Sequence, residues 1–327
     1  MSLDVILRSR VRLARNIKDY PFPPVLNEVC RKEIIEKVTE TATKNGFKTD
    51  DRISSRTDAF TLFEENLISR EFASEKELHA LLVKDDTYIM VCEEDHLRIQ
   101  SFANGLNLAL AGEEAHKCEK MLGEKINFAF NNELGYLTRC PTNLGTAMRS
   151  SVMMFLPALT LSKRMGEIKS QLEKIGMTIR GMYGEGSSAD AYIYQISNRL
   201  SLGVTETDII RKTETIAKRL KEDEINARRA VFETNKDTLT DKIMRSLGVL
   251  KYAHTISSKE FLDCFAYVRL GISLGIINNI SLETIDRLLY DAMPTHIIKT
   301  YKEVAENSNE RDKLRAVIIK KYFTKEE

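Results

Sequence analysis

The two halves of the chain carry different hydrophobic periodicities. Residues 4–15 alternate, with Leu7 and Val11 on one side and arginines on the other, as in a strand with one buried face. Residues 78–102 contain three apolar runs separated by short charged turns, which is typical of an antiparallel meander. From about residue 205 onward, apolar residues recur at helical spacing. This division predicts an α+β fold, with an antiparallel sheet core flanked by helices and a helical C-terminal domain.

Individual elements follow from the same patterns. We expect helices at 28–45 and 105–123, a strand at 137–140, and a helix over the apolar stretch 148–161. Many of the later helical segments begin near Ser, Thr or Asp, which are favoured at helix N-caps. These segments are 206–219, 241–246, 258–274, 281–290 and 311–323.

Charge and cysteine content exclude several classes of protein. There are 49 Lys and Arg against 48 Asp and Glu, so a net charge of +1 leaves no footprint for nucleic acid or an anionic membrane. The cysteines are odd in number and never spaced C-x-x-C, which argues against a disulfide framework and a zinc site. We find neither a signal peptide nor 18 consecutive apolar residues, and expect a cytoplasmic protein. The five cysteines are Cys30, Cys92, Cys118, Cys140 and Cys264.

An acidic run ends one of the predicted buried strands. The apolar residues 88–92 are followed directly by Glu93, Glu94 and Asp95, with Arg98 close behind. In most proteins such a run is a solvated turn. Three adjacent carboxylates repel one another, however, so a fold that keeps them at a strand end is expected to use at least one.

A set of arginines is spread over the first 180 residues of the sequence. Guanidinium groups are costly to bring together unless an anion neutralises them, and their forks match phosphate oxygens. A triphosphate would do so, and phosphoryl transfer needs mainly positioning and charge neutralisation. No Walker P-loop and no H-R-D or D-F-G signature is present. The arginines are Arg8, Arg10, Arg12, Arg98, Arg149 and Arg180.

Two motifs resemble one enzyme family. Residues 92–98, Cys-Glu-Glu-Asp-His-Leu-Arg, resemble the Asn-Glu-Glu-Asp-His box of the ATP:guanido phosphotransferases, and 137–149 resembles their long signature loop. The likeness covers roughly residues 4–250. Residues 180–187, 195–198 and 311–316 are similar instead to the bacterial protein-arginine kinases of that family. The resemblance implies a catalytic domain at 1–205, extending to about 250, and a helical C-terminal domain at 251–327.

The resemblance also implies roles for individual residues. Glu94 would be the catalytic carboxylate, and Cys140 would lie beside the guanidinium nitrogens of the acceptor. The ATP site would comprise Arg8, Ser9, Arg10, Val11, Arg12, Arg98, Arg149, Ser150, Ser151, Val152, Met153, Arg180, Gly181, Met182, Tyr183, Gly184 and Glu185. The C-terminal motif would bind phosphoarginine through Arg311, Asp312, Arg315 and Ala316.

The implied activity is transfer of the γ-phosphoryl group of ATP to arginine side chains of proteins. Mg2+ would be held through the nucleotide, with no metal bound by the protein alone. The resemblance further implies that the reaction inactivates repressors or marks proteins for a protease–chaperone system in a stress response. A zinc-binding activator protein and allosteric control by phosphoarginine would belong to the same system. The resemblance leaves open whether the protein forms a homo-oligomer.

Two alternatives remain open. A phosphagen kinase acting on free arginine is disfavoured, because the chain lacks the small helical N-terminal domain that helps those enzymes enclose their metabolite. A non-catalytic phosphoarginine-binding module is kept because of Ser188 and Cys92, two of three positions at which the sequence departs from the family. Cys92 replaces the usual Asn of the box, Ser188 stands where protein-arginine kinases usually have Glu, and Asn66 replaces a frequent His.

Overall fold

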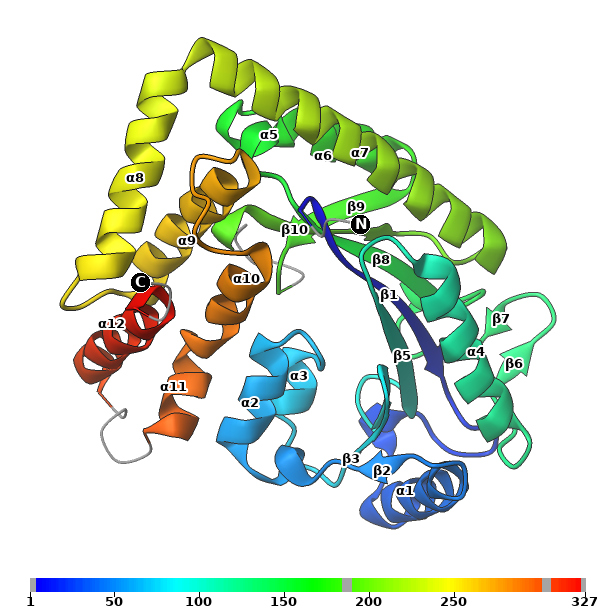
Figure 1. Ribbon diagram of the computed structural model, residues 1–327. Helices are drawn as coiled ribbons and strands as arrows, with labels where there is room; N and C mark the ends of the chain where they lie inside the picture. The colour runs from blue at the N-terminus through cyan, green and yellow to red at the C-terminus, as the bar shows by residue number, and fades with distance from the viewer. Residues whose placement is uncertain (1–3, 184–189, 302–306, 325–327) are drawn as a thin grey trace.

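The computed structural model describes residues 4–183, 190–301 and 307–324 (Figure 1). Its centre is an eight-stranded sheet in the order β2-β3-β4-β5-β1-β8-β10-β9, and every neighbouring pair is antiparallel. A separate hairpin, β6-β7, lies beside it. The strands are β1 (Ile6–Arg15), β2 (Lys48–Thr49), β3 (Ala80–Lys84), β4 (Thr87–Val91), β5 (Leu97–Asn104), β6 (Phe130–Asn131), β7 (Gly135–Tyr136), β8 (Met148–Phe155), β9 (Met177–Gly181) and β10 (Ile193–Asn198).

Helices cover the sheet and extend from it as a C-terminal group. Helices α4 and α7 pack on the central strands, whereas α8 to α12 gather on the other side of the molecule (Figure 1). The helices are α1 (Glu28–Thr43), α2 (Arg56–Glu64), α3 (Arg70–Ala73), α4 (Leu108–Gly123), α5 (Pro157–Leu161), α6 (Met165–Lys174), α7 (Glu206–Thr234), α8 (Lys236–Tyr252), α9 (Ser258–Ser273), α10 (Leu282–Asp291), α11 (Pro294–Thr300) and α12 (Ser308–Thr324). No helix in the described part of the chain is both long and apolar enough to cross a membrane.

Strand β1 shows how the sequence gives the sheet two different faces. Val11 and Leu13 are completely buried in the main core beneath the helices. Because successive side chains of a strand point to opposite faces, Arg10 and Arg12 lie on the other face. Strand β1 pairs with β5 on one side and β8 on the other, so this arginine face is central in the sheet.

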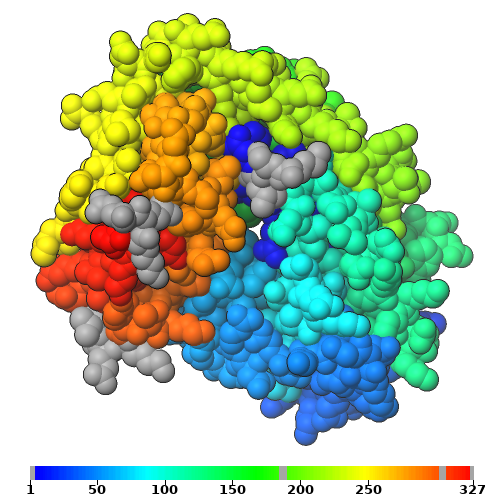
Figure 2. All heavy atoms as spheres, in the orientation of Figure 1, coloured from blue at the N-terminus to red at the C-terminus, as the bar shows by residue number. Residues whose placement is uncertain are grey.

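Two smaller apolar clusters border the arginine face. Helices α2 and α3 pack on β3, β4 and β5 through Phe72, Leu81 and Met90. The C-terminal helices pack on the far end of the sheet, where Phe155 and Ile193 join their core. The open part of the arginine face therefore lies between α2–α3 and the C-terminal helices. Figure 2 shows this side hollowed near its centre, and dark blue atoms of the N-terminal strand are visible inside the hollow.

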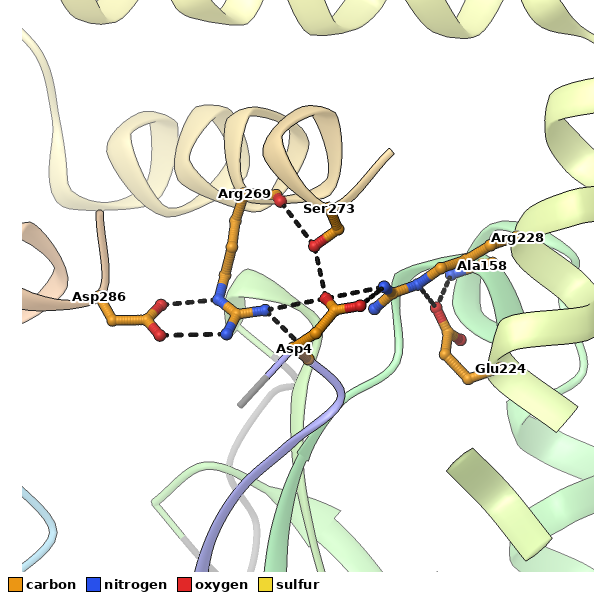
Figure 3. A network of polar contacts seen from close by, with 7 residues as sticks. All are labelled: Asp4, Ala158, Glu224, Arg228, Arg269, Ser273 and Asp286. Atoms are coloured by element: carbon orange, nitrogen blue, oxygen red, sulfur yellow. Dashed lines mark hydrogen bonds and ion pairs between the residues drawn. The ribbon is translucent and has the colours of Figure 1, made fainter. Parts of the chain in front are cut away.

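A buried charge network ties the start of β1 to the helices (Figure 3). Asp4 accepts two hydrogen bonds from Arg228 of α7, at 2.8 and 2.9 Å, and one from Ser273 of α9, at 2.5 Å. Arg269 of α9 donates to the Asp4 carbonyl at 2.7 Å and forms a forked pair with Asp286 of α10, at 2.6 and 3.1 Å. One N-terminal residue thus joins the sheet to two different helical segments.

The α+β prediction is confirmed, with an antiparallel sheet core and a helical C-terminal part. The helix expected at 148–161 is wrong, because 148–155 form β8 and only 157–161 are helical. Strand β8 is central and largely buried, and a continuous apolar run does not distinguish such a strand from a buried helix. The strand expected at 137–140 is also absent, since the strand before it ends at Tyr136.

Candidate active site

The turn between β4 and β5 assigns a different environment to each of its three acids. Cys92, which starts the turn, has a φ of 63°, and this left-handed conformation is tolerated best by Gly, Asn and Asp. Glu93 and Asp95 are buried, whereas the Glu94 side chain is 36% exposed. Glu94 lines the open cleft and has one long contact, 3.4 Å from Oε2 to the guanidinium of Arg98. It is therefore the least constrained carboxylate of the three.

Glu93 fixes Arg98. Its Oε1 accepts hydrogen bonds from Arg98 Nη1 at 2.5 Å and from the hydroxyl of Ser69, while its buried Oε2 has no partner among the described residues. Burial raises the pKa of the Glu93 carboxyl, but the charge of Arg98, the Ser69 hydrogen bond and the charge of Arg12 lower it further, and the net pKa is below the usual value. Glu93 is therefore ionised and holds Arg98 in place.

Asp95 and His96 anchor the neighbouring loops. Asp95 Oδ1 accepts from the Asn16 amide at 2.7 Å and from the backbone N–H of Arg139 at 2.8 Å. His96 Nδ1 accepts from the N–H of Ile17 at 3.0 Å, so its proton lies on Nε2, which donates to the Pro21 carbonyl at 2.9 Å. Burial lowers the pKa of His96. Both side chains are thus structural supports.

Five of the six predicted arginines line one cleft of about 900 Å3. Burial, together with the charges of Arg149, Arg98 and Arg8, lowers the pKa of Arg10 to about 9. Burial and the charges of Arg98, Arg149 and Arg10 also hold the pKa of Arg12 well below its usual value. Repulsion among cations raises the free energy of this site, and an anion bound between them would remove that cost. The five are Arg10, Arg12, Arg98, Arg149 and Arg180.

The sixth arginine lies elsewhere. The guanidinium of Arg8 stacks on the Phe102 ring at 3.7 Å, forms an ion pair with Asp86 at 3.7 Å, and does not line the cleft. Arg149 donates from Nε and Nη2 to the hydroxyl of Ser197, at 3.1 and 2.9 Å. The neighbouring strand therefore positions Arg149 within the cleft.

Cys140 borders the same cleft on the loop anchored by Asp95. Its carbonyl accepts from the Thr138 hydroxyl at 2.9 Å, and its Sγ lies 3.0 Å from the Thr142 hydroxyl. The thiol is half-buried. Cys92 and Cys118, by contrast, are enclosed, and burial raises their thiol pKa values to about 11 and about 12. The structure thus brings Cys140 into one cavity with Glu94 and the arginines.

The remaining predicted nucleotide-site residues divide between the cleft and the protein interior. Met182 and Tyr183 line the cleft, and the hydroxyl of Ser151 is 3.4 Å from the Nε of Arg10. Gly184 and Glu185 lie outside the described residues, as does Ser188. The others are absent from the cleft lining, and all are buried except the half-buried Met153: Ser9, Val11, Ser150, Val152, Met153 and Gly181.

Several cleft residues were not anticipated from the sequence. Phe63 lies on α2, and Arg70 and its neighbour Ser69 are the first residue and the N-cap of α3; neither helix was predicted. Gln100 and Gln195 come from strands. The strand alternation contained a signal for the glutamines. In the register of the sheet, Gln100 pairs with Arg12 and Gln195 pairs with Arg180, so each belongs to the arginine face.

The C-terminal motif does not contribute to this cleft. Arg315 is 1% exposed and donates to the carbonyls of Ala292 and Ile256, both at 2.8 Å, and to Asp312 at 2.5 Å. The guanidinium of Arg315 is therefore hydrogen-bonded within the C-terminal core, where Ala316 is also buried. Arg311, at the start of α12, is half-buried.

Comparisons with known proteins agree with this arrangement. The family profile "ATP:guanido phosphotransferase, C-terminal catalytic domain" matches residues 27–227, and "Protein-arginine kinase McsB C-terminal domain" matches 236–327. The protein-arginine kinase of Caldanaerobacter subterraneus is 40% identical, over 99% of this chain and 98% of its own length. That of Clostridium acetobutylicum is 37% identical, over 97% of this chain and 95% of its own.

Solved structures share the fold at lower identity. A lombricine kinase covers 72% of this chain and 68% of its own, with a TM-score of 0.60 and 22% identity. The duplicated taurocyamine kinase of Schistosoma mansoni, with bound transition-state analogue components, covers 84% of this chain and 47% of its own, with a TM-score of 0.61 and 22% identity.

Proposed function

The chain belongs to the protein-arginine kinases of the ATP:guanido phosphotransferase family and is an ATP-dependent kinase, and we propose that the cleft around Glu94 is where it transfers the γ-phosphoryl group to protein arginines. The observation that carries the assignment is the shared cavity. It places the five arginines described above, the accessible carboxylate of Glu94 and the half-buried thiol of Cys140 around the same space.

The arginine face would bind the triphosphate. Guanidinium forks pair with phosphate oxygens, and in a partly dehydrated cleft such charge-assisted hydrogen bonds are stronger than those at an open surface. The same positive charge would stabilise the transferred phosphoryl group between nucleotide and acceptor. Strands β1, β5, β8 and β9 supply the five arginines. The phosphate clamp that these arginines form is therefore held in place by the sheet.

The carboxylate of Glu94 would act on the acceptor. An arginine side chain is a cation and a poor nucleophile, with a pKa above 12. Glu94 would orient its guanidinium and accept the proton that leaves as the new N–P bond forms and ADP departs. Cys140 lies near enough to the same space to contact the acceptor guanidinium, and a thiolate there would draw positive charge away from the attacking nitrogen.

Magnesium would enter with ATP. Among the described residues, no group of three or more His, Cys, Asp or Glu side chains could hold a metal ion. Mg2+ retains several waters and is commonly held by phosphates, so this site needs no protein cage for it. The partnerless Oε2 of Glu93 is available to accept a hydrogen bond from a metal-bound water. The ion would neutralise charge on the phosphates.

A direct assay tests the proposal. Purified protein with MgATP is given a folded protein substrate or free arginine, and acid-labile phosphate is measured. We expect phosphate on the protein. Phosphorylation of free arginine alone would favour the phosphagen kinase, and no transfer to either acceptor would favour a non-catalytic module.

Arg149→Ala is expected to weaken ATP binding about ten- to a hundredfold. A hydrogen bond to a charged group contributes roughly 1.5–3 kcal/mol, and Arg149 is held toward the cleft by Ser197. Titration calorimetry with MgATP measures the change. Arg199→Ala, an exposed arginine outside the cleft lining, is the matched control. Equal ATP affinity in the two variants would contradict the clamp.

We also propose a separate phosphoarginine site at the start of α12. Because Arg315 is fully engaged within the core, Arg311 is the better probe. Arg311→Ala is expected to lower affinity for a phosphoarginine peptide by about tenfold or more, through loss of one charged pairing. Lys313→Ala removes a neighbouring exposed cation that pairs with Glu310 and serves as control. Calorimetry with phosphorylated and unphosphorylated peptides decides, and equal binding of both by wild type would refute the site.

The wider role follows from the chemistry of the product. Phosphorylation replaces a positive side chain by a negative one, so a repressor modified at a DNA-contacting arginine would lose its phosphate contact. We propose a cytoplasmic enzyme that inactivates repressors and marks damaged proteins for a protease–chaperone system during stress. A zinc-binding activator and stimulation by phosphoarginine would be its regulators.

A further inference from the structure

Two exposed arginines border the cleft without a role in the chemistry above. Arg70 is the first residue of α3, and Arg139 directly precedes Cys140. Both line the cleft. Neither guanidinium has a hydrogen-bond or ion-pair partner within the part of the chain that the structure describes. Most exposed arginines are solvated and have no specific role. Whether Arg70 and Arg139 have one depends on their position relative to the catalytic groups.

The positions of both arginines are fixed relative to Glu94. Ser69, next to Arg70, donates its hydroxyl hydrogen bond to Glu93, while Arg139 donates its backbone N–H to Asp95 at 2.8 Å. Glu93 and Asp95 are the two chain neighbours of Glu94. The segments that carry the two arginines are therefore both tied to the turn of the carboxylate that would receive the acceptor.

Among the described residues, the acids at this rim form no ion pair with either arginine. Glu75 uses its Oε1 to accept from the backbone N–H groups of Lys76 and Glu77, at 2.8 and 3.1 Å. Glu71 is exposed and adjacent to Arg70. Deeper in the cleft lie the five arginines of the clamp. The bound triphosphate would neutralise those five, so the cations that a polypeptide meets on its way to Glu94 are Arg70 and Arg139.

We propose that Arg70 and Arg139 select acceptor arginines that have acidic neighbours in their own chain. This inference rests on the proposed function and adds the substrate class to it. Aspartate or glutamate beside the target arginine would pair with these two rim cations. Lysine or arginine in the same positions would be repelled. Rim charges act mainly on encounter, so the preference lies in KM.

The test compares two peptides that differ only in the residues flanking one central arginine, Glu in one and Lys in the other. Wild type is expected to have the higher kcat/KM for the acidic peptide, by about two- to fivefold for each ion pair, as exposed pairs contribute. The ratio should shrink as salt screens the charges. Arg139→Glu should abolish or invert it, and Arg139→Gln should reduce it while retaining the backbone bond to Asp95. Arg219→Glu, on the exposed side of α7, is the charge-matched control and should preserve it.

The outcomes separate this inference from the proposed function. Equal kcat/KM for both peptides in wild type, or an unchanged ratio in both Arg139 variants, overturns the selection by rim charge while leaving the kinase assignment intact. Phosphorylation of free arginine but of neither peptide overturns the assignment itself. A change in ratio confined to kcat would also contradict the inference, since a rim contact acts before the chemical step.

Discussion

Glu94→Gln is expected to lower phosphoryl transfer by about 10²–10⁴-fold, the usual cost of losing a positioned general base. The amide cannot accept the guanidinium proton, yet it keeps the size and most of the polarity of the side chain. Glu93 and Asp95 cannot substitute for it, because each is buried and bound to a structural partner. Initial rates of protein phosphorylation at saturating MgATP measure the loss.

The control is a carboxylate in the same cleft. Glu71→Gln removes an exposed acid that lines the cleft on α3, and it should have less than a tenth of the effect on kcat. ATP affinity and melting temperature should be close to wild type in Glu94→Gln, since Glu94 makes only one long contact. Turnover in Glu94→Gln within about threefold of wild type would remove Glu94 from the mechanism.

Local patterns predicted part of the sheet that carries the clamp, but they gave β8, the strand of Arg149, as a helix. Alternation along residues 4–15 placed Arg10 and Arg12 on one face, and the strands of the meander are found as β3, β4 and β5. The predicted nucleotide site was too broad, because it included every residue of the runs 8–12 and 149–153. Ser9, Val11, Ser150 and Val152 alternate with the cleft residues and are buried away from it, as strand geometry requires.

Other features depend on long-range contacts that no local pattern contains. Ser69 lies 24 residues before Glu93, yet its hydroxyl helps to hold that carboxylate. Arg315 was expected to face a phosphate together with Arg311, since the two are four residues apart. The structure instead directs its fork to the carbonyls of Ala292 and Ile256, 23 and 59 residues away. Spacing on one helix cannot reveal which side the rest of the chain will cover.

The buried network at Asp4 is another such feature, because the two arginines that bind Asp4 come from the distant helices α7 and α9. Burial raises the pKa of the Asp4 carboxyl, but the charge of Arg228, the hydrogen bonds from Ser273 and Arg228, and the charge of Arg269 lower it further, so the net pKa lies below 3.8. A carboxyl whose pKa is lower in the folded than in the unfolded chain contributes stability that is fully present above the unfolded value. That contribution is lost as the pH falls through the folded value.

Arg269→Met is expected to lower the free energy of unfolding by about 3–5 kcal/mol, the cost of breaking a buried ion network by removing one partner. Arg269 is completely buried, its guanidinium lies 4.5 Å from the Phe155 ring centre, and its loss leaves Asp286 and the Asp4 carbonyl without their donor. Methionine retains the apolar part of the side chain, so the effect reports the charge. Chemical denaturation at neutral pH measures it.

Arg287→Met is the matched control for Arg269→Met. This exposed arginine on the same α9–α10 segment pairs with Glu283 only at 3.9 Å, and its removal should cost less than about 0.5 kcal/mol. Because Arg269 helps to keep the pKa of Asp4 low, Arg269→Met should also lose less stability than wild type as the pH falls below 3.8. A loss of under 1 kcal/mol at neutral pH, or an acid profile parallel to wild type, would show that Arg269 does not hold the start of β1. Since β1 continues into Arg10 and Arg12, a confirmed loss would tie the stability of the phosphate-binding face to the C-terminal helices.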